Sequence, residues 1–458
     1  MGRKPLIVIA LVALAHAALY IAYQRPDWDS TTAWTDQGGY NQLGTGLAVS
    51  GQFTKFPNSA VFVPEVIRTP GYPAFVAAIY LLFGMGNHMA VAIAQAVVFA
   101  GICLMVFALV RRITDERVAT AAGLLAALYA PLPYFGALIL TELWTAFAAT
   151  GAMLACILAV KSGRLRDFFV AGMLFSATAL VRPAFYLMAF FFAIAVPILV
   201  RSQRTAPALK NWAAFAVAAA LTLAPWFTYN YITLGQFSMA PAGGVGRGLW
   251  EGSWQGYWPG RLQAELTDLA TTISERDQLT ARVRDVAQRT QMPADPMLQY
   301  VTEWRDIHEI WDSPTDPLER SRARVVADRE YLSHALANIR RDPIGHLERR
   351  LTRGLFVLWA AEVPIRYSDI NSTPVWFIRS LWLLQIALMA AAGFGAFWLW
   401  RQGRWLDAVL LTLPVIYVTG VHLPLLCEAR QSLPVKPIVI ALATIGIWRP
   451  TFLRSEAS

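Results

Sequence analysis

The residues of this chain that could do chemistry begin with an acidic and a basic position in its first polar segment. Asp36, Tyr40 and Gly44 recur at helical spacing, which predicts that Asp36 opens a helix with its carboxylate on one face. A positioned carboxylate can serve as a general base, although this charge would also complement a helix dipole or suit a short amphipathic helix on a membrane. Arg68 stands just before Pro70, in a turn. Its forked guanidinium could hold a lipid phosphate or simply meet headgroups at the membrane surface.

Further ionisable residues stand at the edges of apolar runs. Glu142 and Arg182 lie at the ends of predicted spans, and His422, Glu428 and Arg430 follow another span near the C-terminus. An ionisable group beside a membrane span is a functional candidate, although a residue at the very end of a span can also reach water. The histidine has no partner at a zinc-binding spacing, so a structural role stays open beside metal binding.

One stretch, residues 250–258, is both aromatic and rich in glycine. Such rings could stack on a sugar or form an interfacial belt. The sequence contains no P-loop, no nucleophile elbow and no dinucleotide-binding glycine pattern, so these motifs suggest no nucleotide or serine-hydrolase chemistry.

The composition of the chain excludes an ordinary soluble enzyme. Of its 458 residues, 56% are hydrophobic and 15% are charged, and the mean hydropathy is +0.43. Soluble domains carry roughly 25% charged residues, and disordered chains are much less hydrophobic. The formal charge of +9 then indicates basic cytoplasmic loops and no nucleic-acid partner. The three cysteines have no spacing typical of a metal site or a disulfide framework.

Apolar runs predict an all-α polytopic membrane protein with about ten transmembrane helices, within a range of about ten to twelve. The predicted spans cover residues 5–23, 88–110, 118–134, 141–160, 168–181, 184–200, 211–227, 374–400, 406–424 and 434–448. Basic residues gather in the loops assigned to the cytoplasm, which predicts that both termini are cytoplasmic. The first run follows Arg3 and Lys4 and has no cleavage site after it, so we expect an uncleaved span.

Two segments are too polar to span and are predicted to lie outside, residues 24–87 and 228–373. In the second, apolar spacing predicts helices near 261–291 and 318–341, separated by breaks at prolines. These prolines are Pro293, Pro296, Pro314 and Pro317. The predicted division is an N-terminal membrane module (1–227) that includes the first outer loop, a mostly helical outer domain (228–373) and a C-terminal membrane module (374–458).

These segments, in this order, resemble the GT-C membrane glycosyltransferases. Within them the chain looks like the protein mannosyltransferase-like and aminoarabinose transferase-like branch, which uses polyprenyl-phosphate sugars. The similarity extends from residue 5 to residue 440, and each motif is weak while the ordered set is fairly specific. The motifs are Asp36 with Tyr40 and Gly44, Arg68-Thr-Pro-Gly-Tyr-Pro leading to Leu82-Phe83-Gly84, Thr141-Glu142, Leu180-Val181-Arg182-Pro183, Pro225-Trp226 with Asn230 and Gly235, Ala335–Ile339 followed by Asp342-Pro343, and Arg430 with Leu433-Pro434.

The resemblance implies roles for the candidate residues. Asp36 would act as general base on the acceptor hydroxyl or organise the site, while Arg68 and Arg182 would contact the donor phosphate. The other residues expected to face the cavity, and there to contact substrate or a metal, are Tyr40, Tyr72, Glu142, His422, Glu428 and Arg430. Two positions depart from the family pattern. Many relatives have a second acidic residue where this chain has Gln37, which puts a divalent metal cofactor in doubt, and a tyrosine where it has Gln431.

The expected activity is transfer of a sugar from a polyprenyl-phosphate donor to an acceptor on the outer face, by a single displacement that inverts the anomeric centre. An arginine would stabilise the leaving phosphate, a carboxylate would activate the hydroxyl, and a closed cavity would exclude water. Besides membrane lipids and the donor, the expected partner is a glycolipid, glycan or protein acceptor. The expected location is the bacterial inner membrane, with the active site on the periplasmic side.

Two other functions compete with this one. The main alternative is an enzyme like an O-antigen polymerase or ligase, which uses pyrophosphate-linked glycans and would rely on outer-loop arginines without needing Asp36. A transporter is disfavoured because transporters place ionisable sites near the bilayer midplane, whereas the centres of these spans are almost free of charge.

Overall fold

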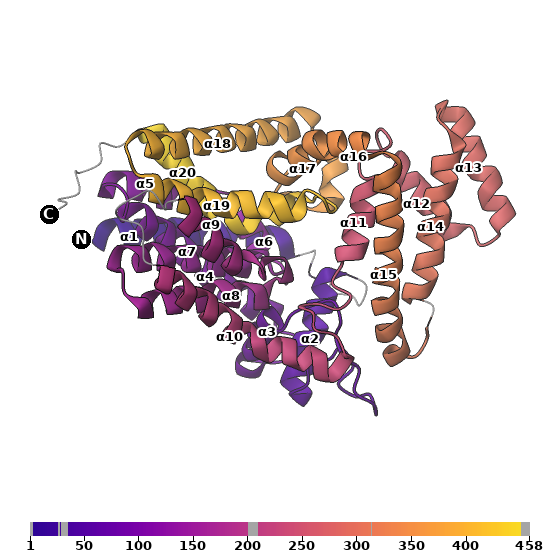
Figure 1. Cartoon of the computed structure of the whole chain (residues 1–458), viewed down its shortest axis with the longest axis horizontal. Helices are drawn as coiled ribbons and strands as arrows, with labels where there is room; N and C mark the ends of the chain where they lie inside the picture. The colour runs from indigo at the N-terminus through magenta and orange to yellow at the C-terminus, as the bar shows by residue number, and fades with distance from the viewer. Residues whose placement is uncertain (1–2, 26–27, 29–34, 200–208, 313, 450–458) are drawn as a thin grey trace.

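The structure, a computed structural model, describes residues 3–25, 28, 35–199, 209–312 and 314–449. Over these residues the chain forms helices, turns and loops, and no strand. Figure 1 shows a helical bundle, with the start of the first helix and the end of the last helix at one end of the molecule. The helices between residues 245 and 349 gather at the opposite end. The prediction of an all-helical polytopic fold with an additional helical part is confirmed.

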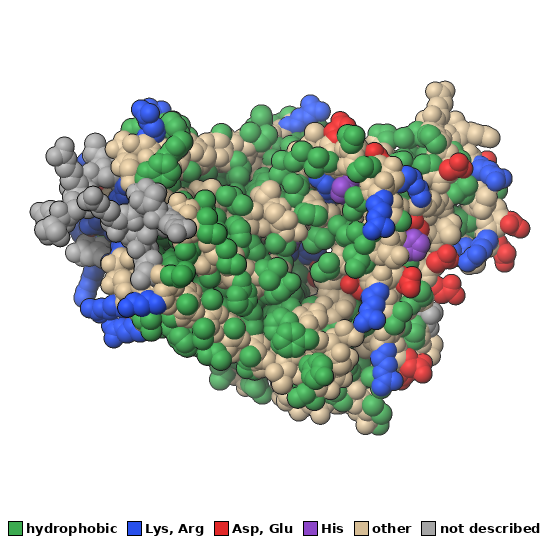
Figure 2. Space-filling model, viewed as in Figure 1, with side chains coloured by type: hydrophobic (Ala, Val, Ile, Leu, Met, Phe, Trp, Pro, Cys, Tyr) green, Lys and Arg blue, Asp and Glu red, His purple; other side chains and the backbone are tan. Residues whose placement is uncertain are grey.

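Seven segments of the described chain form helices that are long and apolar enough to cross a membrane. They are α1 (Arg3–Gln24), α4 (His88–Arg111), α7 (Glu142–Ser162), α10 (Leu209–Leu234), α18 (Val375–Arg401), α19 (Trp405–His422), and the 3-10 helix η5 (Ala429–Val435) continued by α20 (Lys436–Trp448). Figure 2 shows hydrophobic side chains over most of the visible face of the bundle, with Lys and Arg at the end where the termini lie. A surface of this kind is suited to lipid, because mostly apolar side chains would face the hydrocarbon.

The other three predicted spans correspond to shorter helices inside the same bundle. They are α5 (Glu116–Leu128), α8 (Leu165–Val181) and α9 (Met188–Leu199), the last preceded by the 3-10 turn η2 (Pro183–Phe185). Helix α8 packs between α7 and α10, and α5 packs against α1 and α4.

The predicted helix over 118–134 is wrong in its second half. Pro131 has no N–H to donate to the carbonyl of Ala127, so α5 ends at Leu128 and a separate short helix, α6 (Pro131–Gly136), begins. The Nδ1 atom of His16 in α1 lies 2.8 Å from the Ala127 oxygen and fills the vacant hydrogen-bonding position. The carbonyl of Ala127 therefore keeps a hydrogen-bonding partner despite the break in the helix.

Two glycines bring α18 and α20 into close contact. A Cβ atom on Gly395 would collide with the carbonyl oxygen of Leu442, and one on Gly446 would collide with the carbonyl oxygen of Ala391. Small residues at such a crossing let two membrane helices approach until their backbones touch, which increases van der Waals contact where no hydrophobic force acts between helices.

We expect Gly395→Ala to destabilise the protein by about 1–3 kcal/mol, because the added methyl group must push the two backbones apart. The matched control is Gly393→Ala on the same helix, where an added Cβ meets no atom within 4 Å. That variant should be neutral or slightly stabilising, since alanine favours a helix over glycine. Thermal unfolding in mild detergent measures both, and equal melting temperatures for the two variants would contradict this account of the crossing.

The helices at the far end of the molecule have an apolar core of their own. They are α11 (Val245–Trp254), α12 (Leu262–Thr272), α13 (Arg276–Thr290), α14 (Ala294–Asp312), α15 (Pro317–Arg341) and α16 (Pro343–Arg349). The chain then returns to the bundle through the π-helical turn η3 (Arg350–Gly354), α17 (Leu355–Ala360) and the 3-10 helix η4 (Tyr367–Ser372). The aromatic residues Trp250, Trp254 and Trp258 are 2%, 3% and 4% exposed within this core. They therefore form neither a sugar platform nor a membrane belt.

The expectations for this outer part are only partly right. The predicted helix over 261–291 is two helices, because the chain is extended at Ile273 and Glu275. Pro296 does not break a helix, since it lies in the first turn of α14, where a backbone N–H has no intrahelical partner. Pro293, Pro314 and Pro317 do fall between helices or at a helix start. The module boundaries at 227 and 373 stay predictions; α10 itself continues to Leu234.

Candidate active site

Two short helices lie where the bundle meets the outer helices. Helix α2 (Asp36–Ser50) begins at Asp36 as predicted, and the side-chain oxygen of Thr35 caps it by accepting a hydrogen bond from the N–H of Gly38 at 3.0 Å. Helix α3 (Gly71–Phe83) follows the turn that carries Arg68. Both helices thus start beside the same cavity.

This cavity, of about 300 Å³, is lined by residues from both membrane modules and from the outer helices. All of the predicted site residues except Tyr72 line it: Asp36, Tyr40, Arg68, Glu142, Arg182, His422, Glu428 and Arg430. Tyr72 is fully buried behind the cavity wall, where its hydroxyl donates to Oε1 of Gln95 at 3.1 Å and its ring meets the ring of Tyr40 edge-on. Its place is therefore to support Tyr40.

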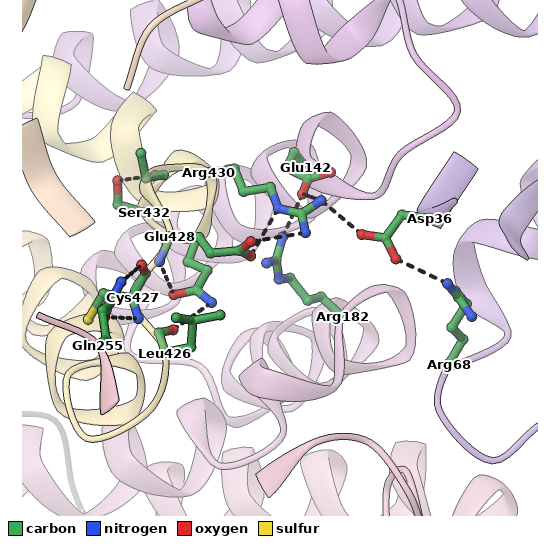
Figure 3. A network of polar contacts seen from close by, with 12 residues as sticks. Asp36, Arg68, Glu142, Arg182, Gln255, Leu426, Cys427, Glu428, Arg430 and Ser432 are labelled. Atoms are coloured by element: carbon green, nitrogen blue, oxygen red, sulfur yellow. Dashed lines mark hydrogen bonds and ion pairs between the residues drawn. The ribbon is translucent and has the colours of Figure 1, made fainter. Parts of the chain in front are cut away.

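The carboxylate of Asp36 lies between two guanidinium groups (Figure 3). Nη2 of Arg68 donates to Oδ1 at 3.1 Å, and Nη1 of Arg430 donates to Oδ2 at 3.0 Å. Desolvation by the surrounding protein acts to raise the pKa of Asp36, but the charges of Arg430 and Arg68 outweigh it and hold the pKa below its ordinary value. The side chain is still 48% exposed, so an ionised carboxylate faces the cavity at neutral pH.

Arg430 also contacts two further carboxylates, so that acidic and basic side chains alternate from Arg68 to Arg182. Its Nε donates to Glu428 at 3.1 Å, and its Nη1 lies 3.8 Å from Oε1 of Glu142. The same oxygen accepts from Nη1 of Arg182 at 3.2 Å, as Figure 3 also shows. The other oxygen of Glu142, Oε2, is buried and has no hydrogen-bond partner within the described residues. Such an acceptor is costly unless a ligand group meets it, because burial removes its water.

The turn before α3 fixes the position of Arg68. Oε1 of Glu65 accepts hydrogen bonds from the N–H groups of Ile67 and Arg68, at 2.9 and 3.3 Å, and Oε2 pairs with Nζ of Lys55 at 2.8 Å. Burial alone would raise the pKa of Glu65, but Lys55 and Arg68 lower it to about 2. The guanidinium of Arg68 lies 4.9 Å from the centre of the Tyr40 ring, within the range of a cation–π contact.

Gly39, one turn into α2, provides the space that this guanidinium occupies. A Cβ atom on Gly39 would lie 2.6 Å from Cζ of Arg68, so the end of that side chain would have to move. If Arg68 binds the phosphate of the donor that the sequence predicts, we expect Gly39→Ala to raise KM for that donor about tenfold, the value of one charge-assisted hydrogen bond. The fold should survive because only a side-chain end is displaced.

The control for this prediction is Gly51→Ala, at the end of the same helix, where an added Cβ meets no atom within 4 Å but the backbone is left-handed. It should lower the melting temperature without changing KM. Steady-state kinetics and thermal unfolding of both variants separate the two effects. An unchanged KM in the Gly39 variant would mean that the position of Arg68 is unimportant.

The sequence analysis did not identify several residues of the cavity, chiefly Gly243 and Gly244 just before α11 and Arg247 and Glu251 within it. Arg247 and Glu251 form an ion pair at 2.9 Å on α11. Glu251 lies in the aromatic stretch that the sequence analysis noted for its rings. Nothing in the sequence indicated that this part of the outer domain returns to the membrane site.

The side chains of this site are not arranged as ligands of a divalent metal ion. Both oxygens of Asp36 face guanidinium groups, and the neighbouring Gln37 carries no carboxylate, is buried and accepts from the N–H of Ile139 at 3.1 Å. Among the described residues no three His, Cys, Asp or Glu side chains are grouped as metal ligands. The positive charge of this site is supplied by arginine.

Comparison with known proteins supports a fold assignment. The family model of dolichyl-phosphate-mannose-protein mannosyltransferases matches residues 67–229, a stretch that includes Arg68, Glu142 and Arg182. A search of the curated proteins finds no match. Among solved structures, the oligosaccharyltransferase of Archaeoglobus fulgidus in its apo form is similar with a TM-score of 0.52 and 15% identity, over 96% of this chain and 50% of that one. The same enzyme in complex with an inhibitory peptide and a dolichol-phosphate gives 0.52 and 14%, over 96% and 49%.

A further similar structure is that of ArnT from Cupriavidus metallidurans bound to undecaprenyl phosphate, with a TM-score of 0.39 and 13% identity, over 94% of this chain and 77% of that one. The chain spans about half the length of the oligosaccharyltransferase, and at such identities that likeness shows the fold alone. The family model matches residues 67–229, and together with the shared fold it supports the GT-C architecture that the sequence resemblance implies. The seven long apolar helices indicate an integral membrane protein.

Proposed function

We propose that this protein transfers a sugar from a polyprenyl-phosphate donor to an acceptor hydroxyl at the outer face of the membrane. The observation that carries the proposal is the ionised carboxylate of Asp36, held between Arg68 and Arg430 in a cavity at the junction of the bundle and the outer helices. Such a site combines a base for a hydroxyl with cations for a phosphate, which are the two groups that this transfer requires.

The donor phosphate would be bound by Arg68 and Arg182. Both side chains are mostly shielded, 12% and 15% exposed, so their charges act in a medium of low dielectric where they stabilise a leaving phosphate strongly. A phosphate that engages Arg68 would take over its contact with Asp36. The carboxylate would then be released toward the acceptor hydroxyl, from which it would accept the proton as the new bond to the sugar forms.

The stereochemical outcome follows from the number of available nucleophiles. Glu142 and Glu428 are both ion-paired with arginines, and we assign neither of them as a covalent nucleophile. A single displacement by the acceptor inverts the anomeric centre, by analogy with inverting glycosidases. Product NMR with a donor of defined configuration tests this, and retention of configuration would overturn the direct displacement.

We further propose that the cavity faces the periplasm and that both termini are cytoplasmic. Figure 2 shows Lys and Arg side chains at the end of the bundle where the two termini lie. They support this orientation, because short cytoplasmic loops carry an excess of basic residues. The outer helices would then lie over the membrane surface and close the site against water, which protects the donor from hydrolysis.

A pyrophosphate-linked donor is the second candidate, because Arg247 adds a further cation to the cavity wall. Native mass spectrometry of the protein purified in mild detergent separates the two. A bound polyprenyl monophosphate, with or without one sugar, supports the proposed donor, whereas a pyrophosphate-linked oligosaccharide supports the polymerase or ligase reaction. If neither lipid is bound or used as a substrate after reconstitution with either class, the proposal fails.

A further inference from the structure

A second cavity, of about 370 Å³, lies behind the wall that carries Arg68. Segment 65–68 separates the two cavities, since Glu65 and Val66 line the second one while Ile67 and Arg68 line the active site. The N–H of Ala242 donates to the carbonyl of Val66 at 2.8 Å, which fastens this wall to the outer part of the chain.

The second cavity is lined by cations that the active site does not use. Lys55 comes from the first outer loop, and Arg320 and Arg324 come from one face of α15 at a spacing of four residues. Among the described residues of its lining, Glu65 is the one carboxylate, and it already pairs with Lys55 and accepts from the backbone of the Arg68 turn. The described lining of the cavity thus carries three cations and one carboxylate.

The two arginines of this cavity are held in fixed positions. Nε of Arg320 donates to the carbonyl of Pro314 at 2.8 Å, and Nε of Arg324 donates to that of Trp311 at 3.4 Å. The guanidinium of Arg324 also lies 5.3 Å from the Trp311 ring centre. The hydroxyl of Ser321, between them, donates to the carbonyl of Pro64 at 3.2 Å and joins α15 to the loop. Guanidinium groups fixed in this way lose little entropy when they bind an oxyanion.

Helix α2 connects the second cavity with the reacting carboxylate. Its residues Asp36 and Tyr40 line the active site and its residue Gln42 lines the second cavity. Gln42 comes six positions after Asp36, which corresponds to a rise of about 9 Å along the helix axis. A substrate that passes around segment 65–68 and extends along α2 could place an anionic group in the second cavity and a hydroxyl beside Asp36.

We propose that the second cavity binds a phosphate group of the acceptor and thereby positions the acceptor hydroxyl for transfer. The assignment of this anion to the acceptor depends on the proposed function, whereas the binding of a phosphate in the cavity does not. The phosphate could belong to a lipid headgroup or to a soluble phosphorylated molecule, and both present the same oxyanion to the arginines.

Binding is tested on the full chain in detergent, in an Arg68→Gln background that weakens phosphate binding in the active site. Calorimetric titration with inorganic phosphate and with dodecyl phosphate should reveal a saturable site, and Arg320→Gln or Arg324→Gln should weaken it about tenfold or more. The matched control is Arg322→Gln, on the same helix but exposed and outside the cavity lining. No saturable binding, or equal losses in all three variants, would overturn the proposal.

The probes also identify the source of the phosphate. Equal affinity for the two probes supports a soluble phosphorylated ligand, and a clear preference for dodecyl phosphate supports a lipid headgroup. Because Arg320 and Arg324 also bond to the chain before α15, melting temperatures are compared for all variants. A further variant, Arg320→Lys, keeps the positive charge but lacks the two parallel N–H groups of a guanidinium. It should bind phosphate with intermediate affinity.

The link with the acceptor is tested by kinetics in the otherwise unchanged protein. Arg320→Gln and Arg324→Gln should raise KM for the acceptor about tenfold and leave kcat and KM for the donor unchanged. A rise in KM for the donor would overturn the assignment to the acceptor. If the protein binds phosphate here but transfers no sugar from any lipid-phosphate donor, the proposed function fails while the anion site stands.

Discussion

Asp36→Asn is expected to lower kcat for sugar transfer by about 10²- to 10⁴-fold, the usual contribution of a positioned general base. The amide keeps the size of the side chain and removes its charge and basicity. Arg68 and Arg430 lose their shared partner in this variant, so the cavity becomes more positive. KM for the phosphate donor should therefore stay the same or fall, and this split between kcat and KM distinguishes a base from a residue that merely binds the donor.

The matched control is Glu116→Gln, which also neutralises a first-turn acid, on α5, where the carboxylate lies 4.0 Å from Arg111. It should leave kcat unchanged. Thermal unfolding must show that both variants are folded. Full activity in folded Asp36→Asn would contradict the glycosyl transfer mechanism and favour an enzyme that relies on its arginines alone.

The pH dependence provides an independent check on Asp36. Because the neighbouring arginines lower the pKa of Asp36, its carboxylate remains deprotonated below the ordinary range for aspartate. The base is active when deprotonated, so kcat/KM should be flat through mildly acidic pH and decline only below that ordinary range. A decline near neutral pH would assign the essential base to another group.

The sequence was sufficient to predict the helix that presents Asp36, because a capping residue, an acid and a run at helical spacing are local signals. It could not show that Asp36 meets Arg430, which is 394 positions away in the chain. That contact depends on how α2 and η5 approach each other in the assembled bundle. Only the resemblance to a family suggested that the two residues share a cavity.

Errors in the sequence analysis came from residues whose role depends on tertiary contacts. The tryptophans of the 250–258 stretch suggested either a sugar platform or an interfacial belt, yet they fill the core of the outer helices and two of them donate to the buried Glu303. Tyr72 looked like a site residue and lies behind Tyr40. An aromatic ring has the same identity in a core and in a site, so composition cannot separate the two.

Arg68→Gln is expected to reduce kcat/KM for the lipid-phosphate donor by about 10²- to 10³-fold, because the variant loses a cation aimed at the charge that develops on the leaving phosphate. Arg68→Lys should recover only part of this activity. A lysine keeps the charge, but it lacks the fork that can bond a phosphate through two N–H groups and fits less well over the Tyr40 ring. A lysine variant with full activity would mean that charge alone suffices at this position.

The same substitution should also change the behaviour of Asp36. Arg68 is one of the three arginines that lower the pKa of Asp36, with Arg430 and Arg182, so its loss raises that pKa and moves the acidic limb of the pH profile to higher pH. The control is Arg166→Gln, an exposed arginine that pairs with Asp167 near the start of α8 and should alter neither the profile nor kcat/KM. If the acidic limb of Arg68→Gln coincides with that of the unmodified protein, the essential base is not electrostatically coupled to Arg68 and the proposed division of labour between the two residues is wrong.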